Sequence, residues 1–251
     1  RLTMRGVELL IAAPLCALLV AITSGFAPFP QLAAEGAPSF TAAYMTGFVG
    51  FVQTWFFMFL LGSLFGKIME ASGAADSVAN WIVTKLGAKH AVLAVVLACS
   101  VLTYGGVSLF VVAFSVYPMA LSLFRVADVP RRFVPAALAF GSVTFTMTSA
   151  GSPEIQNWIP TKFLGTTPYA GWEVSLVVAL AMGIGGYLWL AWMVKRAVTA
   201  GERFEVRLDD PTTEQRSLPA MWQGALPLLA VLSVSFIWHD SLKESALIIA
   251  L

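Results

Sequence analysis

The sequence predicts an all-α membrane protein that crosses the bilayer several times, and three observations support this prediction. The 251-residue chain is 58% hydrophobic and only 12% charged, whereas a soluble domain carries about 25% charged residues. Its apolar residues form long blocks, each close to or above the roughly 20 residues that cross a bilayer as a helix. Six such blocks contain no charged residue: 9–34, 36–66, 91–124, 133–153, 174–194 and 217–238.

The first two blocks predict two spans, which we assign to a scaffold region, residues 1–70. The first span covers residues 7 to about 24 and follows two arginines, so its N-terminal end is placed in the cytoplasm by the positive-inside rule. The loop 25–39 contains prolines but no Lys or Arg and is predicted outside. The second span, residues 40 to about 65, returns to the cytoplasm.

Residues 71–90 are predicted to hold an amphipathic helix that lies in the membrane interface. Apolar side chains of 71–86 fall on one helical face. Gly87 is typical of a helix C-terminus. The alternative is a helix that caps the cytoplasmic end without a function of its own. The opposite, polar face carries Asp76, Ser77, Asn80, Thr84 and Lys85.

The uncharged block 91–124 predicts a re-entrant hairpin. Basic residues flank both of its ends, which places both in the cytoplasm. Its 34 residues are too few for two full spans with a turn, which need about 40, and a single span would separate the ends. The reversal is expected near the centre, at residues 103–108, where glycines permit a tight turn. The alternative is a glycine-containing bend in ordinary packed helices.

The segment 133–165 predicts a broken helix. Residues 133–147 are apolar enough for a helix, but they cover roughly 22 Å, less than the roughly 30 Å hydrocarbon core. The polar stretch that follows is therefore placed inside the membrane, before a second short helix at 158–164. Discontinuous helices of this kind form substrate and ion sites in secondary transporters. The alternative is one full span, 133–151, with Glu154 at the start of an outer loop.

The residues at these two interruptions form the candidate site of a transporter. An anion can be held there by hydroxyls and by backbone N–H groups at helix N-termini. Glu154 is the candidate for proton coupling, because an intramembrane carboxylate is costly and is a functional hypothesis by default. The candidate substrate-binding residues are Thr103, Tyr104, Gly105, Gly106, Ser108, Thr148, Ser149, Gly151, Ser152, Gln156 and Asn157.

The remaining segments complete a topology in which positive charge stays inside. We assign residues 91–170 to a transport half-domain. The helix 171–194 then returns to the cytoplasm and is followed by a charged cytoplasmic linker, residues 195–218. Residues 219–251 are predicted to hold a helix that crosses outward and the start of a second repeat. Every Lys and Arg except Lys162 and Lys243 then lies in the cytoplasm.

Signatures of enzymes and metal sites are missing from the sequence. There is no His-Glu-x-x-His run, no glycine-rich phosphate loop and no Cys/His cluster. We therefore expect no catalytic residue, no metal and no cofactor. The net charge of +1 gives no indication of nucleic acid as a partner.

Several short motifs resemble the gluconate permease family of the ion transporter superfamily. They are FGKIMEASGAA (65–75), KLGAKH (85–90), AGSPEIQN (150–157) and LGTTPY (164–169). The resemblance extends from Arg1 to about Trp238. It implies an N-terminal-half fragment that lacks the first helix and most of the second half of a longer permease.

The resemblance implies a proton symporter of gluconate or a related small hydroxycarboxylate in the bacterial inner membrane. It also implies alternating access, a homodimer, and two inverted repeats, of which this chain holds the first. The hairpin lacks the acidic residue of the gluconate branch, and the break lacks its histidine, so the carboxylate stays open. Two alternatives remain: a sodium-coupled dicarboxylate or citrate carrier, whose Ser-Asn-Thr triplets are missing here, and a non-transporting membrane assembly subunit.

Overall fold

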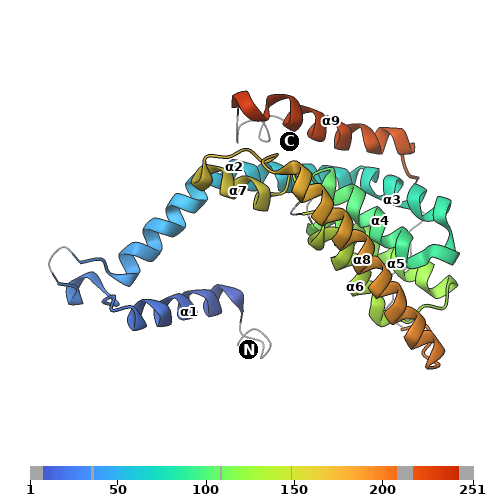
Figure 1. Cartoon of the computed structure of the whole chain (residues 1–251), viewed down its shortest axis with the longest axis horizontal. Coiled ribbons are helices and arrows are strands. Elements are labelled where there is room, and N and C mark those ends of the chain that lie inside the picture. The colour runs from blue at the N-terminus through green and yellow to red at the C-terminus, as the bar shows by residue number, and fades with distance from the viewer. Residues whose placement is uncertain (1–7, 35–36, 108, 148, 208–216, 243–251) are drawn as a thin grey trace. The chain divides into compact units, whose positions relative to one another are not determined.

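The computed structural model is helical in every regular element that it describes, which confirms the predicted all-α fold. Three described helices are long and apolar enough to cross a membrane: α2 (Phe40–Ala71), α8 (Trp172–Thr199) and α9 (Met221–Leu242). The chain forms two compact units, Arg1–Phe57 and Met58–Leu251 (Figure 1). The described residues are 8–34, 37–107, 109–147, 149–207 and 217–242.

The first unit contains α1 (Leu9–Thr23), a single 3-10 turn (Pro30–Leu32) and the beginning of α2. The 15 residues of α1 cover about 22 Å, so the described helix is shorter than a full span. The predicted loop is closed by a backbone hydrogen bond in which the Phe40 N–H donates to the Ala27 carbonyl at 2.8 Å. It is therefore a compact connection between the two helices.

The second unit is built around α4 (Ala91–Tyr104), which packs against α3 (Ala74–Leu86), α5 (Leu109–Val126) and α6 (Val134–Ala139). Most residues of α4 are buried, and nearly all of these are small or β-branched. Small side chains allow neighbouring helices to approach closely. The core of the unit is therefore tightly packed around one helix.

The hairpin predicted for 91–124 is present as α4 and α5, which pack against each other. The helical conformation ends at Tyr104, within the predicted reversal, and resumes at Leu109. The 14 residues of α4 cover about 21 Å, less than the hydrocarbon core. This length suits a helix that enters the bilayer and turns back, and the entry into the bilayer stays a prediction.

The predicted helix break is also present. After a 3-10 turn at Arg131–Phe133, α6 continues as a π-helical turn (Phe140–Thr144), and the next helix is α7 (Ile155–Leu164). The Thr146 hydroxyl donates to the Gly141 carbonyl at 2.9 Å, so a side chain competes with the backbone for this acceptor. Helical geometry thus ends three residues before the predicted Met147, and a single continuous helix over 133–151 is not observed.

The amphipathic helix α3 begins at Ala74, after Gly73 in the left-handed conformation (φ 73°). It meets the helical segment Ala88–Tyr104 at 100°. Its apolar face is buried against α4 and α9. Ser77, which was assigned to the polar face, is buried as well, and its hydroxyl donates to the Pro219 carbonyl at 2.7 Å. The position of α3 in the membrane interface stays a prediction.

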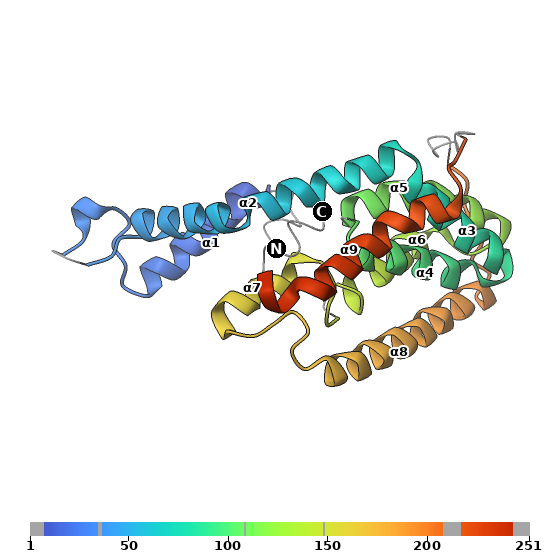
Figure 2. The same cartoon turned by 90° about the horizontal axis from the view of Figure 1, so that it is seen from above.

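Helices α8 and α9 lie at the surface of the second unit. Figure 2 shows α8 along the outside of the group formed by α3 to α6, and only three of its residues are buried: Leu190, Val194 and Ala197. Exposed apolar residues such as Val177 and Ile184 cover most of α8. A helix that is apolar all round belongs in a membrane or inside a larger protein.

We predict that Phe124→Ala destabilises the second unit by about 3–5 kcal/mol, the usual cost of removing a buried aromatic ring from a close-packed core. Phe124 is fully buried on α5. The measurement is chemical unfolding of the full-length protein in detergent. The control is Val126→Ala two residues away, because Val126 is 73% exposed; equal loss of stability in both variants would contradict the described core.

Candidate functional site

The two predicted interruptions meet in space. A Cβ atom built on Gly106, at the hairpin turn, would lie 3.4 Å from Cγ of Pro153 in the helix break. The Tyr104 hydroxyl donates a hydrogen bond of 2.7 Å to the Ala150 carbonyl. Segments almost 50 residues apart in the sequence therefore form one site, which we call the break junction: residues 103–107 together with 149–157.

The hairpin turn is held by backbone hydrogen bonds. Gly106 is left-handed (φ 88°), and its N–H donates to the Thr103 carbonyl, while the Val107 N–H donates to the Leu102 carbonyl, both at 3.0 Å. A side chain at Gly106 would be strained by its φ and would also press on Val231 of α9, 3.2 Å from the added Cβ. Glycine at this position is required by conformation and by space.

The helix break has a defined conformation as well. The Gly151 N–H donates to the Pro168 carbonyl at 3.0 Å, and the Ala150 N–H donates to the Ser175 hydroxyl at 2.9 Å. The Asn157 amide donates to the Ser149 carbonyl and, at 3.4 Å, to the Ser152 carbonyl. Asn157 thus satisfies carbonyls that the interrupted helix leaves without intrahelical partners.

Two helices begin where these segments meet. α5 starts at Leu109, two residues after the described hairpin turn, and α7 starts at Ile155, directly after the break. The N-terminus of a helix carries partial positive charge and free N–H donors. Two helix N-termini therefore follow directly from the junction segments, and their binding of an anion stays a prediction.

Two buried hydroxyls lie in these segments. Thr103 and Ser152 are both 0% exposed, and neither Oγ atom has a hydrogen-bond partner among the residues that the structure describes. A buried polar group without a partner costs about 1–3 kcal/mol. These two hydroxyls are therefore hydrogen-bonding groups that the described part of the fold leaves unused.

Glu154 occupies the N-cap position of α7 in an extended conformation (φ −71°, ψ 144°), and its side chain makes no capping hydrogen bond. It is half-buried. An ionised carboxylate at this position would oppose the binding of a second anion at the same helix end. A protonated carboxyl group would not oppose it, so this residue is suited to link anion binding to a proton.

An aromatic cavity of about 590 Å³ adjoins the break junction. The Phe236 ring packs edge-on against Tyr169, with centroids 5.3 Å apart. The cavity gives a small organic molecule an apolar surface beside the polar backbone. Its lining residues are Tyr104, Ser149, Ala150, Tyr169, Trp172, Leu176 and Phe236.

The structure brings together most of the candidate residues named from the sequence. Gln156 is exposed on α7, whereas Ser108 and Thr148 lie outside the described residues. Their roles in binding stay predictions. The candidates in the break junction other than Gln156 are Thr103, Tyr104, Gly105, Gly106, Ser149, Gly151, Ser152, Glu154 and Asn157.

Sequence reasoning missed three contributors to the junction. Tyr169 packs against Gly151, Ser175 accepts the Ala150 N–H, and α9 covers the hairpin turn through Leu228, next to Gly105. Tyr169 ends one of the family-like motifs, which was the only signal for it. Nothing in the apolar pattern of α9 distinguishes Leu228 from its neighbours. Within the described ranges, no group of His, Cys, Asp or Glu side chains is placed to hold a metal.

A helical hairpin and a broken helix that meet at their interruptions, in a chain with several apolar spans, define a multi-pass membrane protein with discontinuous helices, an arrangement that forms substrate sites in secondary transporters. Comparison with known proteins specifies the class further. The chain belongs to the GntP permease family, whose sequence profile, described as "GntP family permease", matches residues 4–247. It is therefore part of a permease of that family.

Two relatives support this assignment. The uncharacterized transporter YxjC of Bacillus subtilis (strain 168) is 42% identical over 201 residues, covering 80% of this chain and 41% of that protein. An uncharacterized transporter of Haemophilus influenzae (strain ATCC 51907 / DSM 11121 / KW20 / Rd) is 26% identical over 193 residues, covering 76% and 44%. The chain thus spans less than half the length of these relatives. No solved structure matches it.

Proposed function

We propose that the protein is a proton-coupled symporter of gluconate or a related small hydroxycarboxylate, working by alternating access. The observation that supports this most is the break junction, from which α5 and α7 begin and which holds two buried hydroxyls that have no partner within the described part of the chain. Helix N-termini bind carboxylates through N–H groups and the helix dipole. Hydroxyls of the substrate suit Thr103 and Ser152, which offer both a donor and acceptors.

Coupling to a proton follows from Glu154. A substrate anion and an ionised carboxylate at one helix end repel each other, and this repulsion is strong where water is scarce. Protonation of Glu154 removes the repulsion, so the substrate anion and one proton bind together. Release of either one on the opposite side then favours release of the other.

The remaining parts of the proposal concern the whole protein. A second inverted repeat would supply the other half of the site, and the transporter would be a homodimer in the bacterial inner membrane. The N-terminus of this chain would lie in the cytoplasm, because that orientation keeps nearly all Lys and Arg inside.

The test is uptake of radiolabelled gluconate by the full-length protein in proteoliposomes. With an inward proton gradient and no sodium, we expect accumulation above the external concentration, abolished by a protonophore. A sodium gradient without a proton gradient is the control and is expected to drive no accumulation. Accumulation driven by sodium alone would favour the sodium-coupled alternative. No uptake of any small carboxylate under either gradient would favour a non-transporting subunit.

A further inference from the structure

A groove between α8 and the start of the broken helix combines arginines with tryptophan rings. Its polar end is a cavity of about 320 Å³ whose lining includes Arg132, Arg196, Trp189, Trp192 and Met193. Trp189 and Met193 also line an adjoining cavity of about 470 Å³. The groove therefore runs from a basic end into an apolar end along α8. The apolar end is completed by Ala136, Phe140, Thr144, Met182, Gly186 and Leu190.

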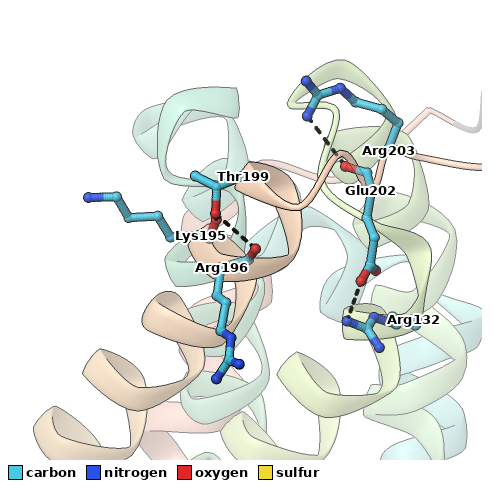
Figure 3. A network of polar contacts seen from close by, with 6 residues as sticks. All are labelled: Arg132, Lys195, Arg196, Thr199, Glu202 and Arg203. Carbon is cyan, nitrogen blue, oxygen red and sulfur yellow. Dashed lines mark hydrogen bonds and ion pairs between the residues drawn. The ribbon is translucent and has the colours of Figure 1, made fainter.

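Each of the two arginines at the polar end contacts an aromatic ring. The Arg196 guanidinium lies over the Trp192 ring at 5.6 Å from its centroid, and Arg132 lies over the Phe133 ring at 5.0 Å. Arg132 also pairs with Glu202 at 2.7 Å (Figure 3). A guanidinium has five N–H donors, so this ion pair leaves Arg132 donors for a second acceptor. Planar guanidinium groups match the geometry of phosphate oxygens.

The groove lies near the C-terminal end of a helix that is apolar enough to span a membrane. Arg196 is in the last turn of α8, a helix apolar enough to cross a membrane, and Trp189 and Trp192 precede it by one to two turns. Tryptophans at the end of a span mark the membrane–water interface. By this rule the basic end is expected at headgroup level and the apolar end at acyl-chain level.

We propose that this groove binds an anionic phospholipid. The headgroup phosphate lies between Arg196 and Arg132, and an acyl chain follows Trp189 and Met193 into the apolar cavity. Charge complementarity selects an anionic headgroup over a zwitterionic one. The apolar cavity favours a lipid over a free phosphate, because a free phosphate has no acyl chain to fill that cavity. This site is separate from the break junction and does not depend on the proposed transport function.

Lipid retention by the full-length protein tests the proposal. The protein is purified from mixed phosphatidylglycerol and phosphatidylcholine vesicles, and bound lipid is counted by native mass spectrometry. We expect preferential retention of phosphatidylglycerol, weakened about fivefold by Arg196→Gln, the factor for one basic residue near an anionic surface. Glycerol phosphate, added at an equal concentration, is expected not to displace the lipid.

The matched control is Lys195→Gln, which removes the same charge from the adjacent residue of α8. Lys195 is exposed and extends away from Arg132 (Figure 3), so this variant is expected to keep wild-type retention. Equal losses of phosphatidylglycerol retention in both variants would show that general surface charge causes the retention, and this result would overturn the proposed site. Wild-type protein without a phosphatidylglycerol preference, or with lipid displaced by glycerol phosphate, would overturn it as well.

Discussion

Replacing Gly151 by alanine is expected to lower substrate uptake at least tenfold. Gly151 is left-handed (φ 76°), and an added Cβ would lie 2.2 Å from Cε1 of Tyr169. The methyl group can be accommodated only if the tyrosine ring or the break moves. A shift of about 1 Å at a binding site can cost about a hundredfold in rate. Uptake of labelled gluconate by proteoliposomes measures the loss.

Gly165→Ala is the matched control for this variant. Gly165 is also left-handed (φ 62°), but an added Cβ there has no atom within 4 Å. It therefore reproduces the backbone strain without the clash, and we expect its uptake to stay within about fivefold of wild type, since strain of this kind costs about 1 kcal/mol. Similar losses of uptake in both variants would show that backbone strain causes the loss in Gly151→Ala and that the Tyr169 contact does not.

Replacing Glu154 by glutamine is expected to abolish accumulation while leaving exchange of substrate intact. Glutamine resembles the protonated carboxyl group in shape, but it cannot release a proton. The substrate anion should still bind, because the helix end carries no opposing charge. The carrier should then exchange labelled for unlabelled substrate across the membrane, yet an inward proton gradient should no longer concentrate the substrate.

The control for Glu154→Gln is Glu173→Gln, which removes an exposed carboxylate from the first turn of α8. We expect this control to accumulate substrate like the wild type. Both counterflow and gradient-driven uptake are measured in the same vesicles. Full accumulation by Glu154→Gln would remove Glu154 from the coupling mechanism and leave the binding site unaffected. Loss of counterflow as well would assign Glu154 to binding.

Local sequence was sufficient for the helices and their interruptions. The basic residues at both ends of the uncharged block 91–124 predicted the hairpin, and Gly105 and Gly106 predicted the position of its turn. The run of small and polar residues from Ser149 to Asn157 predicted the helix break. The end of the helix before the break was less accurate, because the hydroxyl of Thr146 captures a carbonyl, and this competition is not visible in hydropathy.

The sequence by itself determined that this is a multi-pass helical protein with two interruptions, because burial in lipid imposes long apolar blocks and keeps charge at their ends. Only the tertiary structure decided that the two interruptions meet. It also placed Tyr169 and Ser175 in the break and α9 over the hairpin turn, and it buried Ser77. The physical reason is that hydropathy records the environment of each segment, whereas contacts between segments depend on the shapes of side chains distant in sequence.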